Sequence, residues 1–294
     1  MAAGSPASVR IGLNGFPLGH LGPPVDGSPA DVIREIARAA DSLGFDFVCA
    51  QDHVLAPRAW VGAGAAGASW FDPFVLLGSV AAVTSRVRLH TDVVVLPYRS
   101  PFVAAKAAAT LDVLSGGRVT LGVAAGYLEE EFAALGAEFE RRGAWTDEAI
   151  EAIKASWTAE WFSFEGSFFR AGDVALAPRP VQQPRPPVWV GGNSARALRR
   201  AVEHADGWTP FIGDPARIQA LLGSVDRPDG FAVSAPVRRM HTAEGGLDLD
   251  VATARVRGLA AAGVTHVRVG FAGTTLDGFL GQMDRFATAL SLRE

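Results

Sequence analysis

The sequence predicts an α/β protein, and more closely a (β/α)8 TIM barrel with insertion segments. Eight short runs of β-branched and aromatic residues alternate with longer helical patterns, which is typical of parallel strands joined by crossover helices. The chain has 294 residues, and α/β barrels of this length commonly form one domain. Because 49% of the residues are hydrophobic and 20% are charged, the composition suits a globular protein with a large core. We therefore expect a single barrel domain over residues 1–294.

The eight predicted strands follow one another along the whole chain. They are VRIGL from Val9, FDFVCA from Phe45, VRLHTDVVVL from Val87, RVTLGVA from Arg118, VWVGG from Val188, GWTPF from Gly207, FAVSAPVR from Phe231 and HVRVGF from His266. Capping residues and first-turn prolines mark the helices between them. Ser28-Pro29 is predicted to open the first helix, and Ser100-Pro101, Thr146-Asp147-Glu148 and Asp214-Pro215 are predicted to open later ones.

One segment, from Leu111 to Phe132, contains the complete repeating unit. A helix ends at Ser115-Gly116-Gly117, a buried strand starts at Arg118, and the chain leaves that strand at Gly126 with Tyr127 beside it. Glycine allows the backbone to approach a ligand closely. Since the active sites of such barrels lie at the carboxyl ends of the strands, we expect Gly126 and Tyr127 at the site.

Two segments are longer than a minimal barrel requires. The first is a Gly/Ala-rich loop from Arg58 to Ser69, which is either filler or a mobile lid flanked by Trp60 and Trp70. The second, at about residues 162–187, is predicted to form a hairpin around Glu165-Gly166 and then an extended proline-rich arm. We interpret the second segment as an insertion within one domain.

Charge, cysteine content and the N-terminal residues exclude several kinds of partner. The formal net charge is -4, so no general attraction to nucleic acid or to an anionic membrane surface is implied. Cys49 is the single cysteine, which excludes an intramolecular disulfide and predicts a buried reduced thiol. The first residues do not resemble a signal peptide, and no apolar stretch reaches the roughly 18 residues of a membrane span. The sequence therefore favours a cytoplasmic protein.

The segment VWVGGNS contains a candidate phosphate site. A buried strand ends at Gly191 and Gly192, and Asn193 and Ser194 precede a helix. Free backbone amides at a helix start, the helix dipole and the Ser194 hydroxyl together suit a phosphate group. An ordinary helix cap explains the same residues without a ligand, so both interpretations stay open for this segment alone.

Asp52 and His53 follow the second predicted strand and are the candidates for proton chemistry. An imidazole exchanges protons near neutral pH, and the alternative is a structural histidine bonded to the backbone. The other five histidines lack the spacing of zinc ligands, so we predict no metal site. No Ser-His-Asp order, Walker loop or GxGxxG motif indicates a competing chemistry.

Aromatic residues gather in the segments that follow the predicted strands. Such residues suit a hydrophobic or planar substrate, although any one of them can instead belong to the core. The predicted substrate pocket consists of Asn14, Phe16, Trp60, Trp70 and Trp208, with Tyr127 beside it.

Five motifs in order resemble those of one known family. They are DH at Asp52, TDVVVLPYRSP with AKAAATLDVLSGGR, LGVAAGYLEEEF, ALAPRPVQQPRPPVWVGGNS, and ADGWTP from Ala205. Together they span nearly the whole chain, and they are similar to the luciferase-like flavin and deazaflavin oxidoreductases, especially the branch that uses coenzyme F420. The resemblance implies a homodimeric (β/α)8 barrel that holds its cofactor at the carboxyl ends of the strands.

The resemblance also implies roles for single residues. The catalytic set is His53, which would face the reacting ring, Asp52, which would orient or bind, and Tyr127. A cis peptide bond at Asp92-Val93 would press against the back of the ring. The implied cofactor-binding set is Asp52, Thr91, Asp92, Val93, Gly126, Tyr127, Gly191, Gly192, Asn193 and Ser194.

The expected reaction is hydride transfer between coenzyme F420 and a small, hydrophobic or planar organic substrate. Relatives that oxidise glucose 6-phosphate carry Glu at the position of Tyr127, which argues against a sugar phosphate. One alternative is an FMN-dependent two-component monooxygenase that receives reduced flavin from a partner reductase. Another is a flavin-binding barrel without catalysis, which the intact Asp52-His53 pair disfavours.

Overall fold

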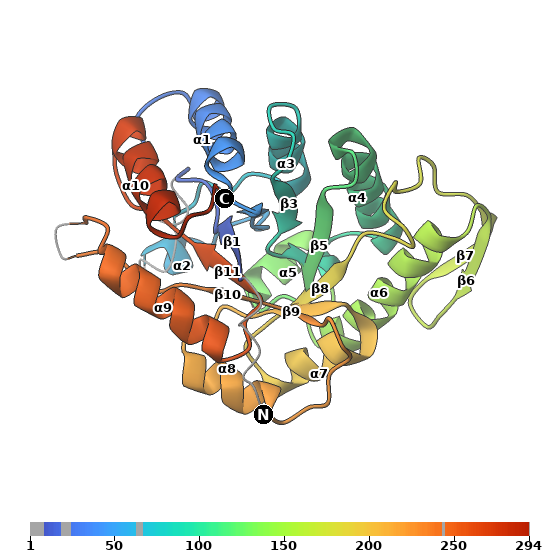
Figure 1. Ribbon diagram of the computed structural model, residues 1–294. Helices are drawn as coiled ribbons and strands as arrows, with labels where there is room; N and C mark the ends of the chain where they lie inside the picture. Colours follow the sequence, from blue (N-terminus) through green and yellow to red (C-terminus); the bar gives the residue numbers. More distant parts are fainter. Residues whose placement is uncertain (1–8, 19–24, 63–66, 243–244, 294) are drawn as a thin grey trace.

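The computed structural model describes residues 9–18, 25–62, 67–242 and 245–293, and their strands form the predicted barrel. Parallel strands close into a ring that is surrounded by helices (Figure 1). The barrel strands are β1 (Arg10–Leu13), β2 (Phe47–Ala50), β3 (Arg88–Thr91), β4 (Val94–Val95), β5 (Val119–Ala124), β8 (Val188–Gly191), β9 (Gly207–Thr209), β10 (Ala232–Pro236) and β11 (His266–Val269). Pairing of β3 with β5 and of β1 with β11 closes the ring, which confirms the predicted (β/α)8 fold.

The third predicted strand forms two short strands in the structure. β3 pairs with β2 and with the amino-terminal part of β5, and β4 pairs with the carboxyl-terminal part of β5. The peptide bond between Asp92 and Val93, which separates β3 from β4, is cis, as the family resemblance implies. Asp92 and Val93 therefore stand at the carboxyl end of β3.

Helices cover the outside of the ring. The longer ones are α1 (Pro29–Leu43), α3 (Pro73–Ala81), α4 (Pro101–Ser115), α6 (Arg142–Thr158), α7 (Ala195–His204), α8 (Pro215–Leu222), α9 (Leu249–Ala261) and α10 (Leu276–Ala289), and the short ones are α2 (Arg58–Gly62), η1 (Leu96–Tyr98) and α5 (Glu129–Leu135). Prolines begin α1, α4 and α8 as predicted. Asp214 caps α8 by accepting from the Ala216 N–H at 3.0 Å, whereas the Ser28 and Ser100 side chains make no capping hydrogen bond.

The helix predicted to open at Thr146-Asp147-Glu148 begins earlier, at Arg142, so that prediction is wrong. Thr146 lies inside α6, where its hydroxyl donates to the Arg142 carbonyl at 2.7 Å instead of capping a helix. Glu148 accepts hydrogen bonds from the backbone N–H groups of Ser167, Phe168 and Phe169. The acidic residues that suggested a helix start therefore serve contacts between α6 and other elements.

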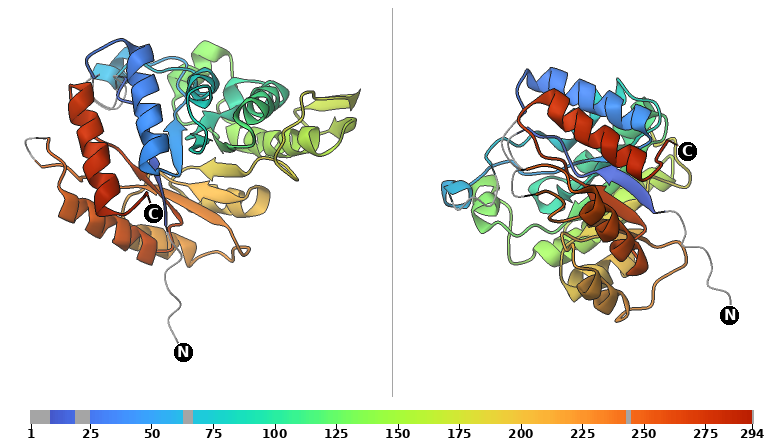
Figure 2. Two further views of the ribbon diagram at one scale, coloured as in Figure 1. Left: turned by 45° about the horizontal axis from the view of Figure 1, so that its top comes forward. Right: turned by 60° about the vertical axis from the view of Figure 1, so that its left-hand side comes forward.

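The predicted insertion forms an antiparallel hairpin of β6 (Phe162–Glu165) and β7 (Arg170–Val174), which confirms the hairpin. The hairpin projects from the side of the barrel beyond α6, as Figures 1 and 2 show. The proline-rich arm then returns to β8 past the Asp112 carboxylate of α4. That carboxylate accepts from the N–H groups of Val181 at 2.9 Å and Gln182 at 3.1 Å, and so holds the arm against the barrel.

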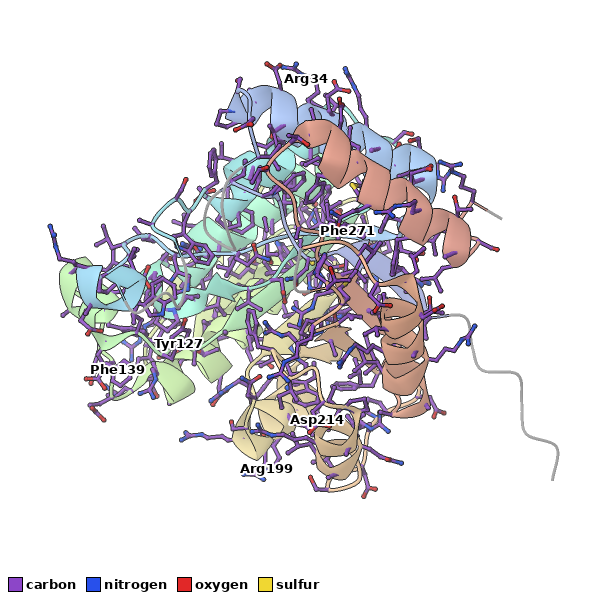
Figure 3. The ribbon with its side chains drawn as sticks, turned by 90° about the vertical axis from the view of Figure 1, so that its left-hand side faces the viewer. Arg34, Tyr127, Phe139, Arg199, Asp214 and Phe271 are labelled. Carbon is purple, nitrogen blue, oxygen red and sulfur yellow. The ribbon has the colours of Figure 1, made fainter. Side chains whose placement is uncertain are left out.

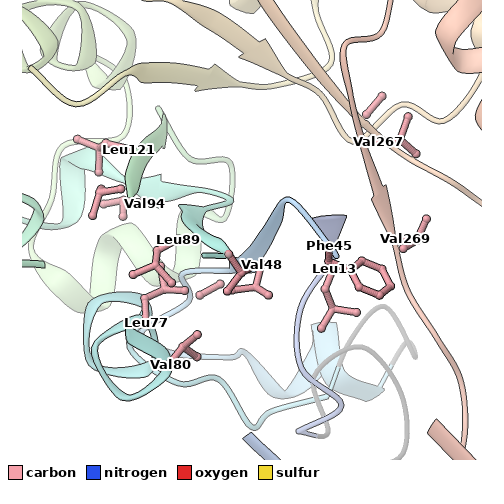
Figure 4. Close-up of a cluster of buried hydrophobic side chains, with 14 of the residues drawn as sticks. Leu13, Phe45, Val48, Leu77, Val80, Leu89, Val94, Leu121, Val267 and Val269 are labelled. Carbon is pink, nitrogen blue, oxygen red and sulfur yellow. The ribbon is translucent and has the colours of Figure 1, made fainter. Parts of the chain in front are cut away.

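Apolar side chains of the strands pack outward against the helices. The fully buried residues of this layer that Figure 4 labels are Leu13, Val48, Leu77, Val80, Leu89, Val94, Leu121, Val267 and Val269. Every residue of β2 and β8 is buried. This continuous burial is typical of parallel strands that are covered on both faces.

The interior of the barrel holds aromatic and imidazole rings. The Trp189 ring lies between His90 and His266, at centroid distances of 4.5 and 4.7 Å, and Phe47 contacts both histidines at 5.8 Å. At Gly12 an added Cβ would lie 2.3 Å from the Phe47 ring, so no larger residue fits. Burial lowers the pKa of both histidines, that of His266 to about 4, and nearby arginine charges act in the same direction.

Cys49 points into the same interior, where its Sγ lies 3.9 Å from Nδ1 of His90, and it is a buried free thiol, as predicted. Burial raises the pKa of its thiol to about 12, although the charge of Arg268 acts in the opposite direction. The thiol is therefore protonated at neutral pH. Over the described ranges, no helix combines the length and the apolar character needed to cross a membrane.

Replacing Leu121 with Ala should lower the free energy of unfolding by about 2–5 kcal/mol, because a fully buried side chain leaves a cavity when it is truncated. Val174→Ala is the control, since Val174 is 41% exposed on β7 of the hairpin. We expect the control to change the unfolding free energy by about 0.5 kcal/mol or less. Urea unfolding curves measure both values, and equal effects would contradict the packing described.

The free energy of unfolding should fall as the pH is lowered from about 6.5 towards about 4. In this window His266 stays neutral in the folded protein but takes up a proton in the unfolded chain, so acid favours unfolding. His266→Gln should lose less stability over the window than the wild type. Urea titrations at both ends of the window test this, and identical losses in wild type and His266→Gln would refute it.

Candidate functional site

A cavity of about 890 Å³ lies at the carboxyl ends of the barrel strands. Its walls come from the segments after β1, β2, β3, β4, β5, β8, β9 and β10 and from the first turns of α6 and α7. The predicted site residues that line it are Asn14, Asp52, His53, Trp60, Trp70, Asp92, Val93, Gly126, Tyr127, Gly191, Gly192, Asn193 and Ser194. The fold thus brings most of the predicted site residues to one cavity.

Thr91 and Phe16 were expected at the site but do not line the cavity, which corrects both expectations. Thr91 belongs to the barrel wall, where its hydroxyl donates to the Gly122 carbonyl at 2.8 Å. Phe16 is 1% exposed and packs in the hydrophobic core. Both side chains contact other residues of the protein and do not face the cavity.

Trp208 is also absent from the cavity wall, so its expected place in the substrate pocket is corrected. It pairs in register with Val190, next to the inward-facing Trp189, and residues that follow one another on a strand face opposite sides. Trp208 therefore lies outside the barrel ring and is fully buried there. Its Nε1 donates to the Gly192 carbonyl at 2.8 Å, which supports the exit of β8 from behind.

The exit of β8 presents free backbone N–H groups to the cavity. Gly192 has a φ of 125°, in the left-handed region that favours glycine. Ser194 caps α7 by accepting from the Ala197 N–H at 3.2 Å. The N–H groups of Ala195 and Arg196 make no hydrogen bond to any described residue. Together with the helix dipole, these groups can bind an anion.

Asp92 and Val93 contribute a charged and an apolar surface between β3 and β8. A Cβ at Gly191 would lie 2.8 Å from Cγ1 of Val93, so glycine leaves room for that side chain. The Asp92 carboxylate forms an ion pair with Arg268 of β11 and accepts from the Thr209 hydroxyl at 2.7 Å. Both members of the ion pair are fully buried, so each charge depends on the other.

Positive charge gathers at one part of the cavity, which we call the arginine end. It is lined by Arg141, Arg142, Arg196, Arg200 and Arg238. In α6 the N–H groups of Gly143 and Ala144, which line the same part, make no hydrogen bond among the described residues. Asp147 pairs with Arg200, Glu138 lies 3.9 Å from Arg141, and Glu140 adds a third negative charge, against five arginines. The arginine end therefore keeps an excess of positive charge, which the sequence analysis did not predict.

Asp52 is held by contacts on both carboxylate oxygens. Its Oδ2 lies 2.7 Å from Nη1 of Arg99, its Oδ1 accepts from Nη2 at 3.0 Å, and Oδ2 also accepts from the Val95 N–H at 3.0 Å. The Asp52 side chain is 3% exposed. The carboxylate thus ties the segment after β2 to the segment after β4, and Arg99 is a site residue that the sequence analysis missed.

His53 contacts a carboxylate that the sequence analysis also missed. Its Nδ1 lies 2.9 Å from Oε2 of Glu131, whose side chain is fully buried, and the Tyr98 hydroxyl donates to the same oxygen at 2.8 Å. Burial alone would raise the pKa of Glu131, but hydrogen bonds from His53, the Leu55 N–H and Tyr98 lower it below its usual value. Glu131 is therefore ionised at neutral pH.

One signal in the sequence could have identified Glu131. On α5 it lies on the same face as Phe132 and the preceding Leu128, which are both buried, whereas Glu129 and Glu130 are exposed. A single acidic residue on the apolar face of a helix needs a partner in the interior. In the described part of the chain, no three His, Cys, Asp or Glu side chains come together as a possible metal site.

Three aromatic side chains surround the His53 ring. Its centroid lies 4.8 Å from that of Trp60, 4.6 Å from that of Trp70 and 6.0 Å from that of Tyr127. Trp60 and Trp70 stack at 5.9 Å with an interplanar angle of 19°. Tyr127 is 63% exposed, and Figure 3 shows it towards the same edge of the molecule as Phe139. We call these three rings the aromatic wall.

The loop predicted from Arg58 to Ser69 differs in part from the structure. Residues Arg58–Gly62 form α2, because the Pro57 carbonyl accepts from the N–H groups of Trp60 and Val61 and so begins a helix. Residues 63–66 lie outside the described residues. The proposed lid movement of residues 61–69 therefore stays a prediction.

Comparison with known proteins identifies the family. The family model described as luciferase-like monooxygenase matches residues 15–237. The chain belongs to the luciferase-like monooxygenase family. This confirms the resemblance seen in the motifs, and membership of this family supports an oxidoreductase activity.

Relatives of this luciferase-like chain use two kinds of cofactor. An uncharacterized protein of Mycobacterium tuberculosis is 36% identical over 206 residues, which cover 70% of this chain and 69% of the relative. An FMNH2-dependent dimethylsulfone monooxygenase of Pseudomonas putida is 32% identical over 67% of this chain and 52% of its own. An F420-dependent glucose-6-phosphate dehydrogenase of Intrasporangium calvum is 32% identical over 71% of this chain and 62% of its own.

Solved structures share the fold. A monooxygenase from Streptomyces bottropensis superposes with a TM-score of 0.79 at 22% identity, over 96% of this chain and 98% of its own. An F420-dependent secondary alcohol dehydrogenase in complex with an F420-acetone adduct has a TM-score of 0.73 at 16% identity, over 98% of this chain and 100% of its own. At these identities the likeness establishes the luciferase-like barrel.

Asp92→Asn should lower the free energy of unfolding by about 3–5 kcal/mol, because Arg268 would stay buried without a countercharge. Asp31→Asn is the control, since Asp31 pairs with Arg34 at the surface, and we expect it to cost about 1 kcal/mol or less. Thermal and urea unfolding of the two variants give the comparison. A loss for Asp92→Asn that is no larger than the control would argue against the buried ion pair.

Proposed function

We propose that this chain is an F420-dependent oxidoreductase that acts on a small, uncharged, hydrophobic or planar substrate. When bound, the deazaflavin supplies or accepts a hydride, and the protein supplies orientation and a proton. The family relationship is compatible with F420 and with FMN. The observation that carries the choice of F420 is the arginine end of the cavity.

The arginine end suits a ligand with several negative charges. Coenzyme F420 has a phosphodiester followed by a tail of glutamates, whereas FMN ends in one phosphate. The N–H groups at the start of α7 are sufficient for one phosphate. Arg141, Arg196 and Arg238 extend the cationic surface beyond that position and are exposed, so they can bind a tail that leaves the cavity.

The rest of the cavity fits the planar ring of the cofactor. Oδ1 of Asn14 lies in the wall, is buried, and has no hydrogen-bond partner among the described residues. A donor on the ring would satisfy it, since buried polar atoms are rarely left unpaired. Val93 offers an apolar surface to the ring, and Gly126 and Gly191 leave the neighbouring wall free of side chains.

His53 is the residue that we assign to proton transfer. Its Nδ1 is occupied by Glu131, while Nε2 makes no hydrogen bond to the part of the chain that the structure describes. In reduction, a hydride reaches the substrate carbon with two electrons, and Nε2 gives a proton to the carbonyl oxygen of a ketone or to the α-carbon of an enone. In oxidation, Nε2 takes that proton back. Asp52 positions the segment that carries His53, and Tyr127 borders the substrate.

The aromatic wall favours an uncharged, flat substrate. Trp60, Trp70 and Tyr127 offer large apolar faces next to His53. Arg99, which lies behind this region, is paired with Asp52. The apolar faces therefore favour a ketone or an enone as the substrate class.

We further propose that the enzyme is a single-domain, cytoplasmic homodimer. Exposed apolar residues on the outer helices α3 and α4, namely Val75, Val103 and Leu114, offer a surface that a second copy would cover. As an F420 enzyme it needs no dedicated flavin reductase at each turnover, which separates it from the two-component monooxygenases.

Fluorescence titration tests the choice of cofactor. F420 with several glutamates should bind about tenfold more tightly than F420 without glutamate or FMN, and added salt should reduce this preference. Arg196→Ala should reduce the preference about fivefold. Arg199→Ala is the matched control, because Arg199 lies on the same helix, is exposed, and does not line the cavity.

Two results would contradict the proposal. Tighter binding of FMN than of every F420 form would favour the two-component monooxygenase. Failure of both cofactors to bind would remove the oxidoreductase assignment for the isolated protein.

A further inference from the structure

The Glu131 carboxylate lies behind His53, and both of its oxygens accept hydrogen bonds. Its Oε1 accepts from the backbone N–H groups of Val54 at 2.5 Å and Leu55 at 3.1 Å. Its Oε2 accepts from the Tyr98 hydroxyl at 2.8 Å and faces Nδ1 of His53 at 2.9 Å. Since the side chain is fully buried, these four contacts replace water around a carboxylate that stays ionised.

The contacts of the two Glu131 oxygens determine which nitrogen of the neutral His53 ring carries the hydrogen. An ionised carboxylate can only accept hydrogen bonds, so Nδ1 of His53 must be the donor to Oε2. The neutral ring then carries its hydrogen on Nδ1, and Nε2 presents a lone pair. The protonated ring keeps the same Nδ1 contact and carries its second hydrogen on Nε2. Proton exchange at Nε2 therefore requires no movement of the ring.

The surroundings of His53 keep this arrangement rigid. Trp60 and Trp70 pack against the ring, whose side chain is 11% exposed. Glu131 is itself anchored to the backbone directly after His53 through Val54 and Leu55. The contact between His53 and Glu131, which are 78 positions apart in the sequence, is thus reinforced by hydrogen bonds from the backbone N–H groups of Val54 and Leu55 to the same carboxylate.

We propose that Glu131 is the positioning residue for His53, which selects the Nδ1–H form of the ring and balances the positive charge when Nε2 is protonated. The proposal rests on the proposed function only for its consequence in catalysis. Tyr98 has a supporting role, since its hydroxyl occupies the second acceptor position of Oε2. Loss of the carboxylate charge should therefore impair proton transfer more than loss of the Tyr98 hydroxyl.

Glu131→Gln tests this assignment because the glutamine amide has one oxygen, which accepts hydrogen bonds, and one nitrogen, which donates them. The amide oxygen must face Val54 and Leu55, whose N–H groups need an acceptor, so the amide nitrogen faces His53. An amide nitrogen donates, and Nδ1 must then accept, which moves the hydrogen of the neutral ring to Nε2. Nitrogen NMR of histidine-labelled protein, with His53→Gln to assign the signal, should show Nδ1–H in the wild type and Nε2–H in Glu131→Gln.

The controls separate this effect from a general structural one. Glu130→Gln changes an exposed glutamate on the same helix and should keep the wild-type form of His53. Tyr98→Phe keeps the carboxylate, so His53 should keep its hydrogen on Nδ1 in this variant. If Glu131→Gln does not fold, the nitrogen NMR spectrum of Tyr98→Phe provides the second measurement. An Nε2–H form in the wild type or in Tyr98→Phe, or an Nδ1–H form in folded Glu131→Gln, would overturn the proposal.

Turnover tests the consequence for catalysis. With reduced F420 and cyclohex-2-enone as the probe, Glu131→Gln should lower kcat by about 100-fold while KM changes by about threefold or less. Fluorescence titration should show unchanged F420 affinity. Failure of the wild type to use F420 would contradict the proposed function alone, because the NMR result on the unliganded protein decides the role of Glu131 independently.

Discussion

The alternation of side chains along the barrel strands determines what each part of this protein can do. Successive residues face opposite sides, so Trp189 fills the barrel interior while Trp208, beside Val190, packs under the outer helices. Rings and buried polar groups fill the interior, and the cavity described above lies where the strands end. Most segments that leave a strand there border this cavity, and the short loops and glycines at these exits decide its shape.

Patterns within one segment predicted the elements well, because each strand and most helices carry their own apolar period and end signals. The same is true of the hairpin and of the exit at residues 191–194. Predictions failed where a residue's role depends on its facing side or on a distant partner. Phe16 and Trp208 are aromatic, as expected of residues in a substrate pocket, but their side chains face the core. Thr146 resembles a cap, yet the helix had already begun.

The residues that sequence reasoning missed are those whose meaning comes from contacts between remote segments. Glu131 reaches His53 across 78 positions, and Arg99 reaches Asp52 across 47. These pairs add no excess positive charge beside the aromatic wall, whereas the arginine end keeps its positive charge. This asymmetry gives the cavity a direction, because a ligand with an anionic tail and a neutral ring is favoured in only one orientation.

The insertion is more closely connected to the cavity than its projecting position suggests. Glu148 of α6 holds the hairpin turn, and the Arg141 guanidinium lies 4.4 Å from the centre of the Phe168 ring, so hairpin and arginine end meet at the start of one helix. Asp112 fixes the returning arm to α4 on the barrel side. The hairpin and the arginine end are therefore in direct contact, and a change in this hairpin would shift the positive charges that line the cavity while leaving the contacts of His53 unchanged.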